Sequence, residues 1–398
     1  MQGQSTRLED RRTVLGIIMG VIFPWGGWMK SATATTSTLV PLAGQPLTLR
    51  VGTYTNGDSR GVYQLTLNRS TGQLQQGGLV VETESPSFLA ASRKDPDWFF
   101  AVGETAGQSG GSLTLFQSNE ANVASVVQQK SSGGDHPCHV CLNQEEDLVA
   151  VANYSSGSFS IYSCSDRGMS SPGTYQNSGS GPNQQRQEGP HGHCVRFVPG
   201  NDRLLLAADL GTDQVLLFMV EEGVVHPELK KLGHVNIKPG AGPRQIDFHP
   251  EGRWFYVINE LDSTICQVTM PDSSGAMEVL QTVSTLPDGF SGNSTTAHIQ
   301  VHPNGQFLYG SNRGHDSIAM FRIDEKTGNL EPLGHQKTGG KTPRHFLIEP
   351  NGQFLLAANQ DSDNVVVFPI SPETGMLGKT QFQASVPRPV CLTPTPAS

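Results

Sequence analysis

One pattern recurs seven times along the chain of 398 residues and limits the folds open to it. Each copy consists of a small residue or an asparagine, a few polar residues and then an alternating apolar run, as in NYSSGSFSIY and NRGHDSIAMF. The copies begin at Gly52, Gly103, Asn153, Asp209, Asn259, Asn312 and Asn359. A period of about 50 residues is typical of repeat architectures in which every copy forms one supersecondary unit.

Each repeat contains the signals of four strands. Segments such as HPEGRWFYVI and HPNGQFLYGS put a glycine turn between two apolar runs, as in a β-hairpin. The turns in RSTGQL, EKTGNL and PETGML lead into a further strand at the edge. Four strands in about 50 residues describe a propeller blade. We therefore predict an all-β, seven-bladed β-propeller over residues 47–392, with four antiparallel strands per blade.

The ends of this array should meet. The apolar segment 386–392 is predicted to pair with the strand that begins near Leu47, so that the N- and C-terminal strands close the ring and remove its exposed edges. Residues 393–398 are then expected to form a tail. Residues 166–188, rich in Ser, Gly, Asn and Gln, are expected to form an exposed insertion.

The N-terminal segment has the features of a targeting sequence. Arg11 and Arg12 precede an apolar run, and residues 32–34 form a small-residue cleavage pattern. The arginine pair resembles a bacterial twin-arginine export signal. We expect residues 1–34 to be this signal, residues 35–46 to be a linker, and the protein to be periplasmic or otherwise exported without a stable membrane span. An uncleaved N-terminal anchor remains the alternative.

Net charge and the positions of His and Cys residues limit the kinds of ligand that the protein is expected to bind. A net charge of -9 argues against nucleic acid as a partner. The cluster His136, Cys138, His139 and Cys141 looks like a metal site, but strand residues three apart face opposite sides, so we predict no metal and no cofactor. The six cysteines lie mostly among apolar strand residues and are expected to be free core thiols. A closed propeller needs no partner chain, so a monomer is expected.

The repeats bring polar residues to one rim. The start of one strand and the end of the next lie at the same edge of an antiparallel hairpin, which predicts that Arg244 and Glu260 are neighbours. The same reasoning collects His139, His193, Arg344 and His345 from the starts of innermost strands, and Asn153, Asn312 and Arg313 from the ends of second strands. The alternative is structural: an ion pair between Arg244 and Glu260, and asparagines that satisfy turns.

Four stretches carry a resemblance to a known family: VGTYTNGDSRGVYQLTLN, GAGPRQIDFHPEGRWFYVINELDST, HPNGQFLYGSNRGHDSIAMFRID and EPNGQFLLAANQDSDNVVVF. The chain resembles the lactonase family of seven-bladed propellers, which includes bacterial 6-phosphogluconolactonase and fungal carboxy-cis,cis-muconate cyclase. The resemblance implies a site of His, Arg and Glu side chains, which falls on His139, His193, Arg244 and Glu260, with Arg313 and Arg344 as further cations. The chain departs from the family at Gln245, where a histidine is common, and at His298, where an acidic or neutral residue is common.

The resemblance implies hydrolysis of a sugar-acid-type lactone, a small-molecule substrate, without a cofactor. In this hypothesis Arg244 stabilises the oxyanion, His193 is the general base, and Glu260 holds Arg244 in place or, if it is buried, accepts the proton itself. Substrate binding is expected from His139, Asn153, Asn312, Arg313, Arg344 and His345. A lactone-forming lyase or isomerase of the muconate cyclase type and a non-catalytic ligand-binding propeller remain as alternatives.

Overall fold

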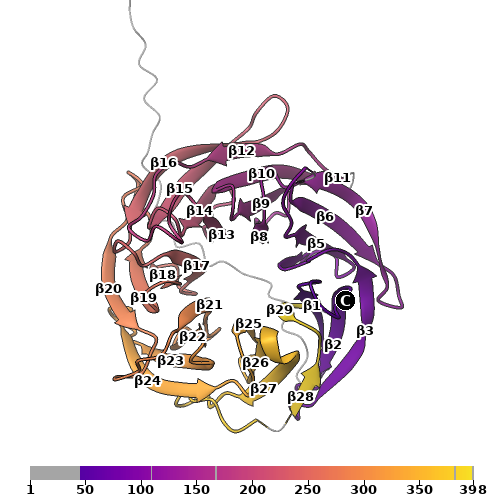
Figure 1. Ribbon diagram of the computed structural model, residues 1–398, viewed down its shortest axis with the longest axis vertical. Helices are drawn as coiled ribbons and strands as arrows, with labels where there is room; N and C mark the ends of the chain where they lie inside the picture. The colour runs from indigo at the N-terminus through magenta and orange to yellow at the C-terminus, as the bar shows by residue number, and fades with distance from the viewer. Residues whose placement is uncertain (1–44, 109, 166–167, 381, 397–398) are drawn as a thin grey trace, which may run out of the picture. The chain divides into compact units, whose positions relative to one another are not determined.

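Seven β-sheets form a ring in the computed structural model, which describes residues 45–108, 110–165, 168–380 and 382–396 (Figure 1). The predicted seven-bladed propeller is therefore confirmed. The predicted export signal and nearly all of the predicted linker lie outside the described residues. Within the described ranges, no helix has the length and apolar character needed to cross a membrane.

The strands of each blade are ordered from the centre of the ring outward (Figure 1). Blade 1 has β29 (Pro389–Pro394), β1 (Leu47–Thr53), β2 (Gly61–Leu67) and β3 (Leu74–Glu82). Blade 2 has β4 (Leu89–Ala91), β5 (Trp98–Gly103), β6 (Ser112–Ser118) and β7 (Ala124–Ser131). Blade 3 has β8 (Pro137–Leu142), β9 (Leu148–Asn153), β10 (Ser158–Ser165), β11 (Gly168–Met169) and β12 (Gly173–Gln176). Blade 4 has β13 (Gly192–Phe197), β14 (Leu204–Asp209), β15 (Gln214–Glu221) and β16 (Glu228–Asn236).

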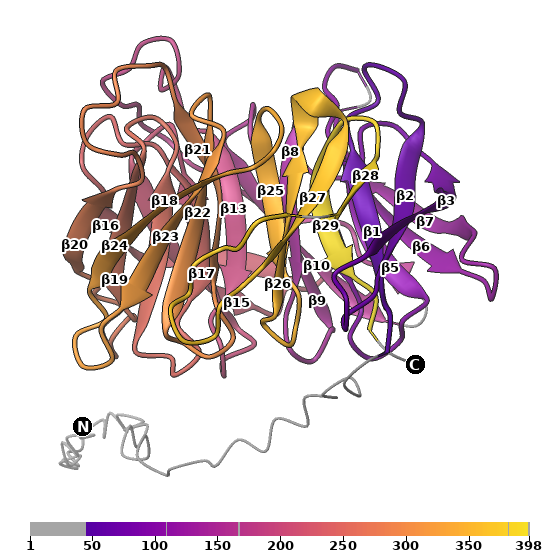
Figure 2. The same cartoon turned by 90° about the horizontal axis from the view of Figure 1, so that it is seen from below.

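The remaining blades follow the same order. Blade 5 has β17 (Pro243–Phe248), β18 (Trp254–Asn259), β19 (Thr264–Thr269) and β20 (Val279–Ser284). Blade 6 has β21 (Thr295–Val301), β22 (Phe307–Arg313), β23 (Ser317–Ile323) and β24 (Leu330–Lys337). Blade 7 has β25 (Pro343–Ile348), β26 (Phe354–Asn359), β27 (Asn364–Pro369) and β28 (Phe382–Ser385), with one 3-10 turn, η1 (Gln360–Ser362), after β26. Seen from the side, the blades stand next to one another and their strands run between the same two faces (Figure 2).

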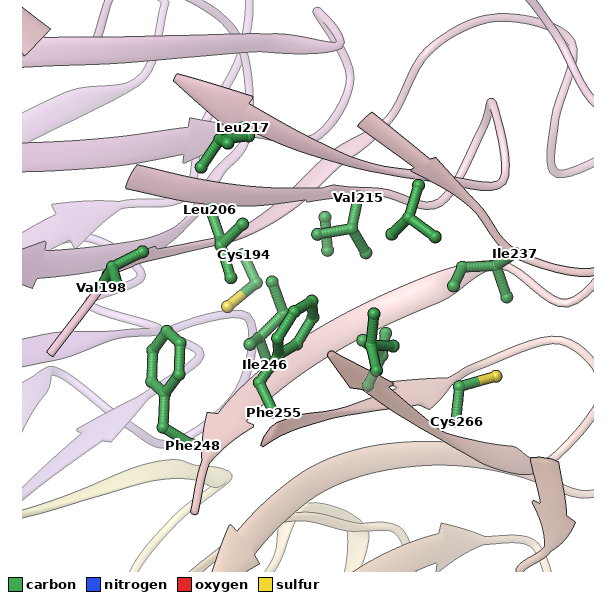
Figure 3. Close-up of a cluster of buried hydrophobic side chains, with 14 of the residues drawn as sticks. Cys194, Val198, Leu206, Val215, Leu217, Ile237, Ile246, Phe248, Phe255 and Cys266 are labelled. Atoms are coloured by element: carbon green, nitrogen blue, oxygen red, sulfur yellow. The ribbon is translucent and has the colours of Figure 1, made fainter. Parts of the chain in front are cut away.

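The middle strands of each blade are apolar on both faces because each blade packs between two others. Every residue of β18 is buried, whereas the outer strand β16 alternates between exposed and covered residues. Between blades 4 and 5, Leu206 and Val215 belong to the same buried cluster as Ile246 and Phe255 (Figure 3). Burial of such side chains, worth about 25 cal/mol per Å² of apolar surface, holds neighbouring blades together.

The ring closes as predicted. Strand β29 pairs antiparallel with β1, with Val51 opposite Leu392. The strand is longer than expected: Thr393 and Pro394, assigned to the tail from the sequence, lie opposite Arg50 and Leu49. Blade 1 therefore takes its innermost strand from the C-terminus and its other strands from the N-terminal part of the propeller.

Blade 3 departs from the prediction in its outer layer. The segment expected to be an exposed insertion forms β11 and β12, and both pair with β10. The outer strand of this blade is thus split into two short pieces. The rest of the segment is not uniformly exposed either, because Gln187 is fully buried.

Candidate active site

A break in strand register sets the direction of several polar side chains. In β17, Pro243 lies opposite Asn259 and Gln245 lies opposite Ile258, so Arg244 has no partner residue in the ladder. The same break leaves Cys138, His193 and Arg344 unpaired in β8, β13 and β25. A bulge of this kind adds one residue and redirects its side chain. Cys138, His193 and Arg344 line one cavity, and Arg244 lines a small hollow beside it.

A second repeated position lies directly after the residue that opens each repeat. In four blades this position holds Glu104, Tyr154, Glu260 and Arg313, and all four side chains line the same cavity. This cavity has a volume of about 280 Å³. Its other lining residues are Cys138, Arg186, His193, Thr295 and Arg344. Residues far apart in the sequence thus meet because they hold equivalent positions in different blades.

The predicted pair of Arg244 and Glu260 is confirmed. The Nε of Arg244 donates to Oε2 of Glu260 at 2.8 Å, and both side chains are buried. Two further guanidinium groups bind the same carboxylate: Nη2 of Arg313 lies 3.0 Å from Oε2, and Nη2 of Arg186 lies 2.7 Å from Oε1. Nε2 of His193 lies 3.7 Å from Oε2.

These cations determine the charge of Glu260. Burial alone would raise its pKa, but Arg313, Arg244, His193 and Arg186 together lower the pKa well below its ordinary value. Glu260 is therefore a carboxylate at neutral pH. It is fully occupied with cationic partners, so it is better suited to orient them than to accept a proton.

His193 faces Glu260 on one side and Cys138 on the other. Its Nδ1 lies 3.5 Å from Sγ of Cys138. Burial, reinforced by the charge of Arg244, lowers the pKa of His193 well below 6.5. The imidazole is consequently neutral at pH 7 and able to accept a proton.

Arg344 has a different environment. Its guanidinium lies over the ring of Tyr54 at 5.2 Å, and the Tyr54 hydroxyl lies 2.9 Å from both carboxylate oxygens of Glu104. Burial alone would lower the pKa of Arg344, but Tyr54 and Glu104 raise it above its ordinary value. Among the residues that the structure describes, none forms a hydrogen bond or an ion pair with this guanidinium. Arg344 is a charged group with free donors at the cavity wall.

Four predicted site residues lie elsewhere. The amides of Asn153 and Asn312 are fully buried and donate to the backbone carbonyls of Ser132 and Thr285, which joins each second strand to the loop before its blade. Both asparagines therefore connect parts of the fold, and neither is among the residues that line the large cavity. His139 and His345 follow the bulge residues, so they point away from the large cavity: the ring of His139 packs at a tilt against Phe88, with centroids 4.1 Å apart, and His345 stacks on His298 at 3.8 Å.

The two departures from the family pattern contact each other. Nδ1 of His298 hydrogen-bonds Oε1 of Gln245, although the two residues come from neighbouring blades. An imidazole therefore lies next to Gln245, the position where the family commonly has a histidine, but it comes from β21 instead of β17. With Arg244 and His345, Gln245 lines a small hollow of about 10 Å³ beside the main cavity.

Sequence reasoning missed Tyr54, Glu104, Tyr154 and Arg186. Glu104 occupies the same repeat position as Glu260, and this equivalence was the signal that could have found it. Arg186 carries no such signal because it lies in the Gln- and Asn-rich segment between blades 3 and 4.

The site offers no evident metal centre. Over the described ranges, no three His, Cys, Asp or Glu side chains are grouped so that they could hold a metal ion. All six cysteines are free thiols. What the arrangement provides is a cavity with several fixed guanidinium groups, two carboxylates and a neutral imidazole.

Seven blades around a cavity of Arg, His and Glu side chains are features of propeller lactonases. The chain is a member of the lactonase family of seven-bladed β-propellers, whose family model matches residues 48–394. A protein of Bacillus subtilis named 6-phosphogluconolactonase is 34% identical over 282 residues, which cover 70% of this chain and 78% of that protein. A 6-phosphogluconolactonase of Formosa agariphila is 32% identical over 298 residues, covering 72% and 82% of the two chains.

A solved structure is similar over almost the whole propeller. The periplasmic gluconolactonase of Pseudomonas aeruginosa superposes with a TM-score of 0.82 at 28% sequence identity. The match covers 88% of this chain and 99% of that chain. The fold is thus shared with an enzyme that its name assigns to the periplasm.

Proposed function

We propose that this protein is a lactonase that hydrolyses a sugar-acid-type lactone in the cavity around Glu260. One observation carries the proposal: a carboxylate held by three guanidinium groups lies beside a neutral histidine in a cavity of about 280 Å³. Such a site can stabilise the negative charge that develops on a carbonyl oxygen during ester hydrolysis. The names of the Bacillus subtilis and Pseudomonas aeruginosa relatives support the same activity.

The chemical step follows from the charges of the groups. Burial lowers the pKa of Arg244 to about 10, so its guanidinium is still charged at pH 7. Arg244 stabilises the oxyanion that forms when water attacks the lactone carbonyl. His193 accepts the proton of that water, and Glu260 stabilises the resulting imidazolium. When the ring C–O bond breaks, the proton passes to the leaving alkoxide, which gives the open hydroxy acid.

The charge balance of the site favours an anionic substrate. Arg186, Arg244, Arg313 and Arg344 contribute four positive charges, and Glu104 and Glu260 contribute two negative charges, so two positive charges remain uncompensated. Arg344, with its free donors, binds the carboxylate or phosphate of the substrate. Glu104 accepts hydrogen bonds from substrate hydroxyl groups. A polyhydroxylated lactone with an acidic group matches both.

We also propose that the protein acts outside the cytoplasm, as the arginine pair at residues 11–12 and the apolar run after it suggest. The periplasmic gluconolactonase supports this assignment. An external sugar-acid lactone is then the substrate to test first.

The test is acid release from a panel of lactones in a pH-stat. We expect hydrolysis of sugar-acid lactones, and a loss of about 100- to 1,000-fold in kcat for Arg244→Ala, because one oxyanion donor is worth that much. His193→Ala should lose about 100-fold or more. The matched control is Arg253→Ala, since Arg253 lies at the other end of the same hairpin and pairs with Glu251 on the surface.

Three results would contradict the proposal. Ring closure from the open acid would indicate a lyase, and binding without turnover of any lactone would indicate a ligand-binding propeller. Full activity in both the Arg244→Ala and His193→Ala variants would remove the assignment of the site.

A further inference from the structure

Arg186 is the outermost of the cations that hold Glu260. Its side chain is 38% exposed, whereas those of Arg244 and Arg313 are 3% and 15% exposed. The Glu260 side chain beneath them is only 5% exposed. Arg186 therefore lies at the boundary between the cavity and the solvent, where an entering ligand meets it first.

The guanidinium of Arg186 bridges two blades across the cavity. Nη2 donates both to Glu260 of blade 5 and to the hydroxyl of Tyr154 of blade 3, at 2.7 and 3.1 Å. Neither Nε nor Nη1 donates a hydrogen bond to any residue in the described part of the chain. These N–H groups are thus available to an oxygen atom of a ligand.

The backbone of Arg186 is fixed by the next residue. The buried amide of Gln187 donates to the carbonyl of Leu210 at 2.8 Å, and its Oε1 accepts from the backbone N–H of Asn183. The backbone N–H of Gly181 donates to the carbonyl of Gln187 at 3.0 Å. A segment without regular strand structure is in this way anchored to blade 4, so Arg186 is held in place over Glu260.

Two cations already compensate Glu260 from within the blades. Arg244 and Arg313 both contact Oε2, and of the described cations Arg186 is the one that contacts Oε1. One carboxylate needs only one cation for neutralisation. Arg186, as the third, adds to the net positive charge of the cavity. Its exposed position is that of a group that attracts anions rather than one that stabilises the fold.

We propose that Arg186 is a specificity-determining residue that selects lactones bearing a carboxylate or phosphate over neutral lactones. This inference rests on the proposed lactonase function. Arg186 attracts and binds the anionic group at the entrance, while Arg244, His193 and Glu260 act on the ring. Its charge therefore acts on the capture of the anionic substrate.

The test compares Arg186→Gln with the wild-type enzyme on a phosphorylated and an unphosphorylated sugar lactone. Glutamine removes the charge, and because its amide reaches only as far as Nε of arginine, it also removes the hydrogen bonds that Nη2 donates to Glu260 and Tyr154. We expect kcat/KM for the phosphorylated lactone to fall about tenfold more than kcat/KM for the neutral lactone, with the larger increase in KM on the phosphorylated lactone. The KM for the phosphorylated lactone should also become less sensitive to salt, because the screened charge is gone.

The matched control is Arg203→Gln. Arg203 has almost the same exposure, 40%, and pairs with Glu222 on the surface of blade 4. This variant should change neither KM. If Arg186→Gln does not fold, Arg186→Lys, which keeps the charge, serves in its place: wild-type selectivity supports the proposal, and selectivity lost at wild-type kcat overturns it.

A second measurement separates this inference from the proposed function. Titration calorimetry with 6-phospho-D-gluconate as anionic probe and D-glucitol as neutral probe needs no turnover. If the wild-type protein hydrolyses no lactone, the proposed function fails, but a tenfold weaker binding of the anionic probe alone in Arg186→Gln still supports the role of Arg186. Equal losses for both probes, equal losses for both lactones, or a fall in kcat at constant KM would overturn it.

Discussion

At the scale of single residues, adjacent positions in the chain have different roles: one side chain stabilises the fold, and the next lines the cavity. Asn153, Asn259 and Asn312 hold the strands of their blades together, and the residue after each of them lines the cavity. Likewise, Cys138 reaches the cavity and the next residue, His139, does not. Neighbouring residues have different roles because alternate strand positions face opposite sides and a bulge shifts that alternation.

Glu260 is the residue on which the arginine cluster depends. Glu260→Gln would leave three guanidinium groups without a counter-charge in a buried site. We expect the free energy of unfolding to fall by about 3–5 kcal/mol, the range for one partner removed from a buried ion pair, and lactone hydrolysis to be lost. Urea unfolding and the pH-stat measure the two effects.

Glu222→Gln is the control for this variant, because Glu222 is exposed and, among the residues that the structure describes, forms an ion pair only with Arg203. It should unfold at the urea concentration of the wild type. A Glu260→Gln protein as stable as the wild type would mean that the three arginines do not need the carboxylate.

That Arg244 and Glu260 are neighbours could be predicted from the sequence. The turn between the two strands fixes their register, and the register places the start of the first strand beside the end of the second. The direction of each rim side chain could not be predicted. A bulge shifts the hydrogen-bond register of a strand by one residue, and many residue types can occupy the extra position, so the sequence does not reveal it. This is why His139 was predicted in place of Cys138, and why His345 was predicted together with its neighbour Arg344.

At the scale of elements, β29 is the strand that turns an arc of blades into a ring. Its side chains Val390, Cys391 and Leu392 are buried, and it pairs with β1 along its length. A chain that ends at Arg388 should lose about 1.5–3 kcal/mol for each of its large apolar side chains, Val390 and Leu392. It should also associate through the free edge of β1, because an unpaired strand edge can pair with another chain.

Urea unfolding and size-exclusion chromatography test this prediction. A chain that ends at Pro396 keeps the whole of β29 and is the matched control. A chain without β29 that remains monomeric and fully stable would show that the ring does not need its closing strand.

Strand number and order were predictable because alternation and glycine turns repeat in every blade. The segment between blades 3 and 4 was not. Its polar composition indicates an exposed loop, yet Gln187 is buried because backbone groups satisfy its amide. Composition reports the polarity of a side chain but not whether partners will be available for it.

At the scale of the whole molecule, buried histidines make stability depend on pH. His139, His193, His298 and His345 come from four different blades, and burial lowers the pKa of each below 6.5, to about 3 for His345. Between pH 6.5 and 3 the unfolded chain binds protons that the folded protein does not. The free energy of unfolding should therefore fall as the pH is lowered through this window and be independent of these groups above it.

Urea unfolding at pH 7, 5.5 and 4.5 measures the dependence. Each fully uncharged histidine contributes up to about 1.36 kcal/mol per pH unit within the window. His345→Gln should give a shallower pH dependence than the wild type. An identical slope in the two proteins would rule out His345 as a contributor.

The pairing of β29 with β1 also has a consequence for biosynthesis. Thr393 donates to the carbonyl of Leu89, 304 positions earlier in the chain. Ribosomes add about 5–20 residues per second, and N-terminal parts of a chain generally begin to fold first. Here the first blade cannot be completed before β29 is made, so β1 leaves the ribosome long before its partner strand exists. The nascent chain must pass through an open arc of blades, and the ring is completed only after β29 has been translated.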